Sequence, residues 1–343
     1  MREIIIGQKE AGQRLDKYLS KYFSEANKSF IYKMLRKKNI VRNEKKADGS
    51  ERLAEGDSIK LYFKEETFHE LTAEKKETAT VISKLPSENV QAMSILFENQ
   101  HILAINKPAG MLSQKARPED ISLIEHLTQY LLKTGELKQE ELLTFHPGIC
   151  NRLDRNTSGI IIAGKTIEGL QVMGRLFKER EIDKFYFCVV KGEIHNSERI
   201  EGYLTKHHNH NKVTIAKEAS EGADFIKTQY EPLLAGDGLT LLKVKLITGK
   251  SHQIRAHLNS IGHPIVGDGK YGDVSINKQF RKEFHLKHHL LHAATLQFPV
   301  MEGEWEALSK MEIKAPLPNY FIEIIRDCFD GGEMLCRHGI QED

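Results

Sequence analysis

The sequence has 343 residues, of which 40% are hydrophobic and 29% are charged, which excludes a collagen-like, low-complexity or fully disordered chain. The length suits about two globular domains. The net charge of +2 indicates no partner, but residues 1–62 hold 15 Lys and Arg against 9 Asp and Glu. This local excess is compatible with a polyanion as partner, although a solvated surface is the simpler interpretation of charge alone.

Sequence features of secreted and membrane proteins are absent. The first nine residues have no apolar signal-peptide core, and no apolar run approaches the roughly 20 residues of a membrane-spanning helix. The cysteines have no CxxC spacing, so we predict neither a disulfide framework nor a thiolate metal site. We therefore expect a cytoplasmic protein that does not bind membranes.

The N-terminal residues predict a small unit of helices and strands. Apolar residues at helical spacing predict a first helix over residues 14–23. Ser29 is expected to cap a second short helix, which carries a basic face. Short strands are expected at residues 40–43 and 58–63, with a turn at residues 53–57 between them.

This unit resembles the S4 RNA-binding domain in the order of its pieces: residues 14–19, the basic second helix, the strand at 40–43 and the Gly56-Asp57 turn. In that family the second helix and the hairpin after it bind structured RNA. The resemblance therefore implies RNA contacts at Lys33, Arg36, Lys37, Lys38 and Arg42.

Four segments are predicted along the chain. The S4-like unit covers residues 1–64, and a linker or loosely attached strand covers residues 65–90, which lack a long apolar period. A larger domain covers residues 91–330, and a mobile tail covers residues 331–343. In the larger domain, strands and helices alternate without a fixed repeat.

Within the larger domain, a hairpin is predicted from strands at residues 95–98 and 102–105. A helix is expected over residues 121–132, because Leu123, Leu127 and Leu131 are in register. Further strands are predicted at residues 185–190 and 240–247.

A charged, turn-rich loop leads directly into the apolar residues 160–163, and Asp154 lies in it between Arg152 and Arg155. Such a loop at the end of a buried strand can hold a reactive side chain rigidly, and neighbouring cations keep a carboxylate ionised. The alternative is a turn aspartate that makes only local hydrogen bonds, and composition alone favours it.

The loop reads Asn-Arg-Leu-Asp-Arg-Asn-Thr-Ser-Gly over residues 151–159 and resembles the catalytic motif of the RluA-type pseudouridine synthases. Two further motifs of this family follow in order: Lys-Phe-Tyr at residues 184–186 and Thr-Gly-Lys-Ser-His-Gln-Ile-Arg-Ala-His at residues 248–257. Together with the S4-like unit, they resemble the RluC/RluD branch, which modifies large-subunit ribosomal RNA.

The resemblance implies that uridines in RNA are isomerised to pseudouridine by base flipping, C1′–N1 cleavage and rejoining through C5. Asp154 would be the catalytic carboxylate, acting at C1′ or on a sugar proton. Tyr186 would stack on the flipped uracil and assist at C5, and Arg255 would pair with Asp154. The alternatives are a strand-core tyrosine and a surface helix arginine.

RNA is expected in a basic groove, and the candidate contacts there are Lys107, Arg152, Arg155, Lys250 and His252. Ser251 is predicted to cap the helix that carries Arg255. The chain departs from the family pattern at Asn151 and Asn156, and Lys250-Ser251 replaces the commoner Arg-Thr. Lys250 keeps the charge but not the bidentate fork.

No cofactor is expected, because the product is an isomer of the substrate. We predict no metal site, since the two histidine clusters lack a neighbouring cysteine or carboxylate pair; they comprise His207, His208 and His210, and His285, His288, His289 and His292. RNA is the expected partner of a monomeric protein.

Two other functions stay open: a non-catalytic RNA-binding ribosome factor, and a nucleosidase or glycosidase, which would use two carboxylates. The predicted fold class is α+β: the S4-like unit, then a catalytic domain with a mixed, mostly antiparallel sheet and flanking helices.

Overall fold

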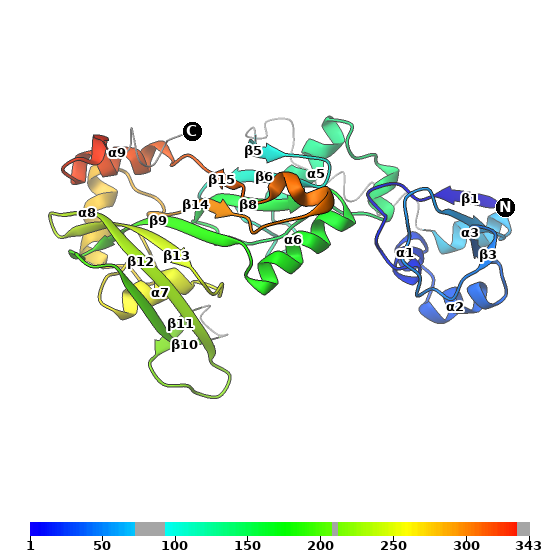
Figure 1. Ribbon diagram of the computed structural model, residues 1–343, viewed down its shortest axis with the longest axis horizontal. Helices are drawn as coiled ribbons and strands as arrows, with labels where there is room; N and C mark the ends of the chain where they lie inside the picture. Colours follow the sequence, from blue (N-terminus) through cyan, green and yellow to red (C-terminus); the bar gives the residue numbers. More distant parts are fainter. Residues whose placement is uncertain (73–92, 208–211, 335–343) are drawn as a thin grey trace.

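The computed structural model describes residues 1–72, 93–207 and 212–334 (Figure 1). A small unit formed by residues 1–72, here called the N-terminal unit, lies at one end of the molecule. The rest of the described chain forms a larger domain on an 11-stranded sheet. Within the described residues, no helix is long and apolar enough to cross a membrane.

The N-terminal unit packs three helices against a four-stranded antiparallel sheet in the order β1-β4-β2-β3. Its strands are β1 (Arg2–Ile5), β2 (Ile40–Arg42), β3 (Lys45–Lys46) and β4 (Ser58–Leu61). Its helices are α1 (Leu15–Tyr22), α2 (Lys28–Arg36) and α3 (Glu65–Leu71). The apolar stripe predicted for the first helix does face the core of this unit, where Leu15, Tyr18, Leu19 and Phe23 are buried.

Two predictions for this unit are wrong. Asn27, not Ser29, caps α2, because its side chain accepts a hydrogen bond from the Phe30 N–H at 2.8 Å. The predicted linker begins with helix α3, whose Phe68 is buried against the aromatic ring of Phe23. The sequence did not predict this short helix because a single buried aromatic residue creates no hydrophobic periodicity. Residues 73–90 of that linker lie outside the described residues.

The larger domain has the predicted mixed, mostly antiparallel sheet. Its main strand order is β11-β10-β12-β13-β9-β14-β8-β6-β5, with β15 on β14 and β7 on β8. Only β14 and β8 pair in parallel among the described strands. The strands are β5 (Ser94–Glu98), β6 (Ile102–Lys107), β7 (Gly148–Ile149), β8 (Ser158–Gly164), β9 (Asp183–Lys191), β10 (Glu198–His207), β11 (Lys212–Ala216), β12 (Asp224–Gly236), β13 (Leu239–Leu246), β14 (Leu291–Gln297) and β15 (Glu312–Lys314).

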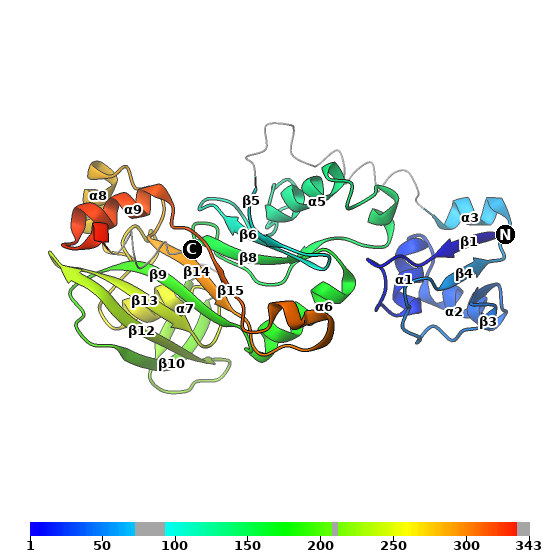
Figure 2. The ribbon, with the colours of Figure 1, turned by 45° about the horizontal axis from the view of Figure 1, so that its top comes forward.

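Helices cover both faces of this sheet, as Figure 2 shows for α5 and α6. The α-helices are α5 (Leu123–Lys133), α6 (Ile167–Glu179), α7 (Gln253–Ser260), α8 (Val274–Glu283) and α9 (Asn319–Cys328), with 3-10 helices η1 (Glu140–Leu143) and η2 (Gly303–Leu308). The predicted strands at 95–98, 102–105, 185–190 and 240–247 fall in β5, β6, β9 and β13.

Successive residues of the central strands enter different cores, because side chains alternate across a strand. Tyr186 and Cys188 of β9 join α5 and α7 in one core, whereas Phe187 and Val189 join α8 and α9 on the other face. Strand β8 is buried along its whole length for the same reason. This explains why its sequence reads as a continuous apolar run.

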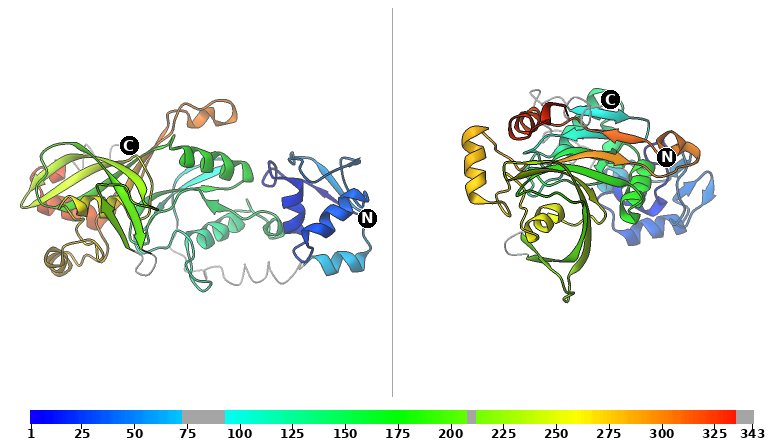
Figure 3. Two further views of the ribbon diagram at one scale, coloured as in Figure 1. Left: turned by 90° about the horizontal axis from the view of Figure 1, so that it is seen from below. Right: turned by 60° about the vertical axis from the view of Figure 1, so that its left-hand side comes forward.

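The N-terminal unit contacts the larger domain near η1 and α6 (Figure 3). Lys9 forms a 3.0 Å ion pair with Glu141, and its carbonyl accepts from the Ile167 N–H at 3.0 Å. The Thr144 hydroxyl donates to the buried Glu10 carboxylate. These contacts join segments more than 100 residues apart, so they place the N-terminal unit relative to the sheet.

The predicted C-terminal tail lies largely beyond the described residues. Residues 332–334 have helical geometry, and the Gly332 N–H donates to the Phe329 carbonyl at 3.0 Å.

Gly159, at the start of β8, is where the backbones of β8 and β14 approach most closely. Its φ is +111°, and a Cβ there would lie 2.2 Å from the Ala293 carbonyl oxygen. We predict that Gly159→Ala lowers the free energy of unfolding by about 2 kcal/mol or more, because the added methyl group forces the two strands apart. Urea unfolding followed by circular dichroism measures this loss.

Gly174→Ala is the matched control, because Gly174 lies inside α6 and a Cβ there meets no atom within 4 Å. This variant should gain up to about 1 kcal/mol from helix propensity. Equal stability of Gly159→Ala and the wild type would contradict the close approach described here.

Candidate active site

A cleft of about 630 Å³ opens on the α7 side of the sheet. Its lining includes Asp154, Tyr186 and Arg255, which come from three segments far apart in the sequence. The loop before β8 supplies the aspartate, β9 the tyrosine and α7 the arginine. The volume is within the range of small-molecule pockets and suits one extruded nucleotide.

Asp154 lies on a loop that is held by hydrogen bonds on its N-terminal side. On its N-terminal side, the Ser113 hydroxyl donates to the Leu153 carbonyl at 2.7 Å and accepts from the Leu153 N–H at 3.2 Å. Farther back, the Asn151 side chain bonds the backbone of β8 at Ile160 and Ile162. The Asp154 side chain is 28% exposed, so it faces the cleft instead of being sealed in the interior.

Arg255 pairs with Asp154, as expected. Its Nη1 donates to Asp154 Oδ2 at 2.6 Å, while Nε and Nη2 donate to the two oxygens of Asp268 at 2.7 and 2.9 Å. Burial alone would lower the pKa of Arg255, but the carboxylates of Asp268 and Asp154 raise it above its ordinary value. The guanidinium is therefore a permanent cation between two anions.

His252 lies next to this pair, with Nε2 at 3.9 Å from Asp154 Oδ2. Its other ring nitrogen is 3.0 Å from the Tyr271 hydroxyl. Burial lowers the pKa of His252, and the charge of Asp154 only partly opposes this. His252 also occupies the N-cap of α7 in a left-handed conformation with φ of 56°, so the prediction of Ser251 as the cap is wrong.

Tyr186 is buried in the core below the cleft and is 7% exposed. The side chain also lines the cleft. Tyr186 is therefore both a residue of the core and a residue that can contact a ligand. Burial and the charge of Asp154 raise the pKa of its phenol, which keeps the group neutral. A neutral aromatic ring beside a carboxylate suits stacking against a base.

The cation beside Asp154 does not come from its sequence neighbours. Arg152 and Arg155 are both exposed, and within the described residues neither forms an ion pair with Asp154. Arg155 instead donates to the Gly110 carbonyl at 3.0 Å. Adjacent residues point in different directions from a loop, so proximity in sequence was a poor guide to the charge partner.

Lys107 is the clearest correction to the predicted RNA contacts. It is fully buried at the end of β6, and its Nζ donates to the carbonyls of Pro108, Met111 and Arg155 at 2.9, 2.9 and 3.2 Å. Burial lowers the pKa of Lys107 to about 7, against the opposing charge of Asp154. This side chain ties the loop after β6 to the loop that carries Asp154 and does not reach the surface.

The other predicted cations lie on the surface. Lys250 lines the cleft and forms a 2.6 Å ion pair with Asp224. On the N-terminal unit, Lys33, Arg36, Lys37 and Lys38 are exposed, whereas Arg42 pairs with Asp57 at 2.7 Å.

Sequence reasoning missed a second set of cations on the cleft wall. Lys178 and Arg180 come from the end of α6, and Lys206 comes from β10. They belong to no motif, and only the packing of α6 beside the sheet brings them to the cleft. The sequence analysis also gave no role to Asp268, which lies a few residues after α7 in the chain.

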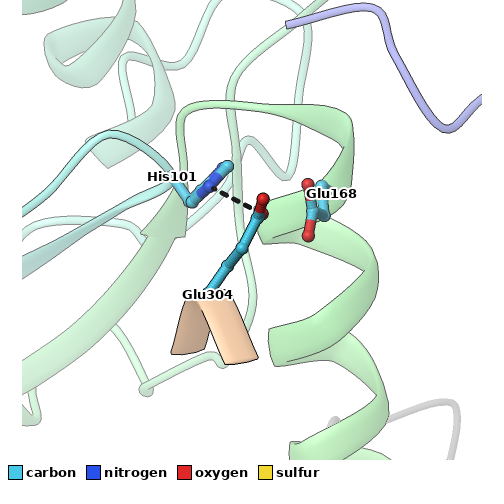
Figure 4. A group of neighbouring side chains, drawn as sticks. All are labelled: His101, Glu168 and Glu304. Atoms are coloured by element: carbon cyan, nitrogen blue, oxygen red, sulfur yellow. Dashed lines mark ion pairs between the residues drawn. The ribbon is translucent and has the colours of Figure 1, made fainter. Parts of the chain in front are cut away.

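The described residues contain one group with the spacing of metal ligands: His101, Glu168 and Glu304 (Figure 4). The buried His101 ring already contacts Thr166 Oγ1 at 3.1 Å and the Gln100 amide at 3.0 Å. Glu304 is largely exposed, and none of the three lines the cleft. We assign no metal to this group, because both ring nitrogens have protein partners.

The histidines of the second sequence cluster have different environments in the structure. His289 and His292 are buried, bond Thr157 and Ser158 at 2.8 Å, and have pKa values lowered by burial to about 4. They are neutral groups that hold the start of β8. His208 and His210 lie outside the described residues.

Comparison with known proteins follows this geometry. The family model for RNA pseudouridylate synthase matches residues 101–260, which hold the three cleft residues. An uncharacterized RNA pseudouridine synthase of Mycoplasma genitalium is 30% identical over 94% of this chain and 98% of its own length. This chain belongs to the RNA pseudouridine synthase family. Enzymes of this family isomerise uridine to pseudouridine in RNA, so the RluA-type assignment and the enzyme class are confirmed.

Further relatives of the synthase agree in length as well as sequence. The ribosomal large subunit pseudouridine synthase C of Vibrio vulnificus is 28% identical over 94% of each chain. Among solved structures, human RNA pseudouridylate synthase domain containing 4 aligns with a TM-score of 0.55 and 21% identity, over 68% of this chain and 92% of its own. The latter supports the fold of the larger domain.

We predict that Lys107→Met destabilises the synthase without changing how RNA binding depends on salt. Three carbonyls lose their donor, which costs about 2 kcal/mol or more. A phosphate contact would instead contribute about one unit to the slope of log affinity against log salt. Thermal unfolding and filter binding at several salt concentrations measure the two effects.

Lys206→Gln is the comparison variant, because Lys206 lines the cleft and is exposed. It should lower the salt slope and leave the thermal midpoint nearly unchanged. If Lys107→Met lowered the salt slope and Lys206→Gln lowered the thermal midpoint, Lys107 and not Lys206 would be the residue that contacts RNA.

Proposed function

We propose that the synthase isomerises uridines of large-subunit ribosomal RNA, with Asp154 as the catalytic carboxylate. The observation that carries this proposal is the 2.6 Å pair of Asp154 with Arg255 in a cleft that Tyr186 also lines. The names of relatives such as the Vibrio vulnificus synthase support the choice of ribosomal RNA. We also propose that the enzyme acts as a monomer in the cytoplasm.

In this mechanism the target uridine leaves its stack and enters the cleft, at a cost of a few kcal/mol. Asp154 attacks C1′ or removes a sugar proton, and either route breaks the C1′–N1 bond. The free uracil turns and rejoins through C5; Asp154 is then released from C1′ or returns the sugar proton, C5 loses its proton and N1 gains one. Every atom of the substrate is in the product, so the reaction needs no cofactor.

Arg255 and Tyr186 have separate roles in this scheme. Arg255 orients Asp154 and stabilises its charge when the nucleotide excludes water from the cleft. Tyr186 stacks on the uracil and permits rotation, because stacking has no directional hydrogen bond; its worth is about 1–3 kcal/mol per base. A role of Tyr186 in the loss of the C5 proton is part of this proposal and follows from the family resemblance.

RNA is held by two groups of cations in this proposal. One lies around the cleft and comprises Arg152, Arg155, Lys250, His252, Lys178, Arg180 and Lys206. The other is the exposed basic face of α2 and the residues after it, Lys33, Arg36, Lys37 and Lys38. We propose that residues 1–72 are an S4-like RNA-binding domain and that residues 93–330 are the catalytic domain. The contacts at Lys9 and Glu10 would hold these two domains together on one RNA.

The glycosidase alternative needs a second carboxylate facing the scissile bond. The nearest candidate is Asp268, whose side chain is fully buried and bonded to Arg255 through both oxygens. It cannot act as an acid or base on a substrate in the cleft. The arrangement therefore supports isomerisation over hydrolysis.

Asp154→Asn should abolish catalysis and leave the fold intact, because asparagine keeps the shape but not the charge. We expect a loss of at least about 1,000-fold in single-turnover rate on a ribosomal RNA transcript. Carbodiimide mapping of pseudouridine in RNA from a deletion strain measures the product.

Asp237→Asn is the control, since Asp237 is exposed at a turn with φ of 51°, a conformation that asparagine tolerates. It should retain full activity. If Asp154→Asn restored every phenotype of the deletion strain without restoring the pseudouridines, the non-catalytic RNA-binding alternative would be favoured. If it also restored the pseudouridines, Asp154 would not be the catalytic carboxylate.

Lys33→Gln/Lys37→Gln should weaken RNA binding and lower its salt slope by about 1 to 2 units, because two phosphate contacts are lost. The rate at saturating RNA should stay within about threefold of the wild type. Lys278→Gln/Lys282→Gln on α8 removes two exposed lysines from the opposite end of the molecule and should change neither quantity. If both double variants weakened RNA binding equally, general electrostatic attraction would explain the loss, and α2 would hold no RNA site.

A further inference from the structure

Asp268 is a buried anion close to the reacting group but outside the cleft lining. Its side chain is fully buried, and its two oxygens accept from Arg255 Nε and Nη2 at 2.7 and 2.9 Å. Burial alone would raise the pKa of Asp268, but the hydrogen bonds and the charge of Arg255 lower it to about 2. The carboxylate is therefore ionised, and its geometry with the guanidinium is bidentate.

The backbone around Asp268 is fixed independently of Arg255. Asp268 Oδ1 accepts from the Lys270 N–H at 2.8 Å, and its carbonyl accepts from the Asn277 side chain at 2.9 Å. Asn277 Oδ1 in turn accepts from the Gly267 N–H at 2.7 Å. Because Asn277 is on α8, the carboxylate is anchored to a helix and not only to a loop.

This anchor determines which way the guanidinium points. A planar fork that is bound along its Nε and Nη2 edge cannot rotate about its terminal bonds without losing both hydrogen bonds. The remaining Nη1 is then directed at Asp154 Oδ2, at 2.6 Å. The other oxygen of Asp154 takes part in no hydrogen bond within the described part of the chain, and the side chain is partly exposed to the cleft.

We propose that Asp268 is a positioning residue for catalysis: it locks Arg255 so that one oxygen of Asp154 is held and the other stays available for the sugar. This inference rests on the proposed role of Asp154. Asp268 acts through Arg255 and never touches the substrate. A displacement of the guanidinium by a few tenths of an ångström would move the carboxylate of Asp154 by a similar amount.

The first experiment compares Asp268→Asn with the wild type in single-turnover and steady-state kinetics on a ribosomal RNA transcript. Asparagine offers one acceptor and places an N–H against the guanidinium, so the fork loses its bidentate partner. We expect kcat to fall about 10- to 100-fold while KM and the affinity for RNA change by less than about threefold. If Asp268 had only a structural role, its replacement would lower the thermal midpoint without lowering kcat selectively over KM.

The second experiment repeats the change in an Arg255→Lys background. Lysine keeps the positive charge but lacks the fork, so Asp268 has nothing left to orient. The double variant should therefore be as active as Arg255→Lys alone, within about threefold. If the two losses multiplied, Asp268 would act independently of Arg255 and the proposal would be overturned.

Asp273→Ala is the matched control from the same loop. Asp273 caps α8 by accepting from the Ile276 N–H at 3.0 Å and pairs with Lys191, but it does not contact Arg255. Its replacement should cost stability and leave kcat unchanged. If it reduced kcat as much as Asp268→Asn, loosening of the loop alone would explain the loss, and the proposal would fail.

Asn277→Ala decides the question if Asp268→Asn does not fold. It removes the support behind Asp268 while both charges stay in place, and we expect kcat to fall about 3- to 10-fold with unchanged KM. Full activity of a folded Asp268→Asn or Asn277→Ala would overturn the proposal, provided that Asp154→Asn is inactive. An active Asp154→Asn would instead refute the proposed role of Asp154.

Discussion

The active site depends on one arginine shared between two carboxylates. Arg255 is almost completely buried, and an unpaired cation there would be strongly unfavourable. Asp268 supplies the compensating charge in the interior, and Asp154 supplies it at the edge of the cleft. The interaction that makes the burial of Arg255 tolerable is therefore the one that orients Asp154, the proposed catalytic carboxylate.

The sheet brings the parts of this site together. Strands β8, β14 and β9 are neighbours, and close approach at Gly159 brings β8 against β14. The loop that carries Asp154 leads into β8, and Tyr186 lies two strands away on β9. Lys107 and Ser113 then hold the loop from the side of β6. Rigid strands under a loop that is bonded at several points can keep a carboxylate in place.

The N-terminal unit extends the molecule away from the cleft and carries its own exposed cations. Its contacts with η1 and α6 are mostly polar, with an ion pair at Lys9 and a buried hydrogen bond at Glu10. Polar interfaces of this kind are typical of domains that adjust to a ligand. In the proposed function, a large, structured RNA is bound at two sites, of which only the cleft performs chemistry.

Local patterns in the sequence predicted the first helix and the strands that became β5, β6, β9 and β13, because periodicity is a property of neighbouring residues, but they missed the short helix α3. The resemblance of three ordered motifs indicated the family and pointed to Asp154, Tyr186 and Arg255. The tertiary structure decided the contacts. It left Arg152 and Arg155 exposed without an ion pair to Asp154, buried Lys107 under three carbonyls, and brought Lys178, Arg180 and Asp268 to the site. A charge finds its partner across space, and burial depends on what the rest of the chain packs over it, so neither can be read from adjacent residues.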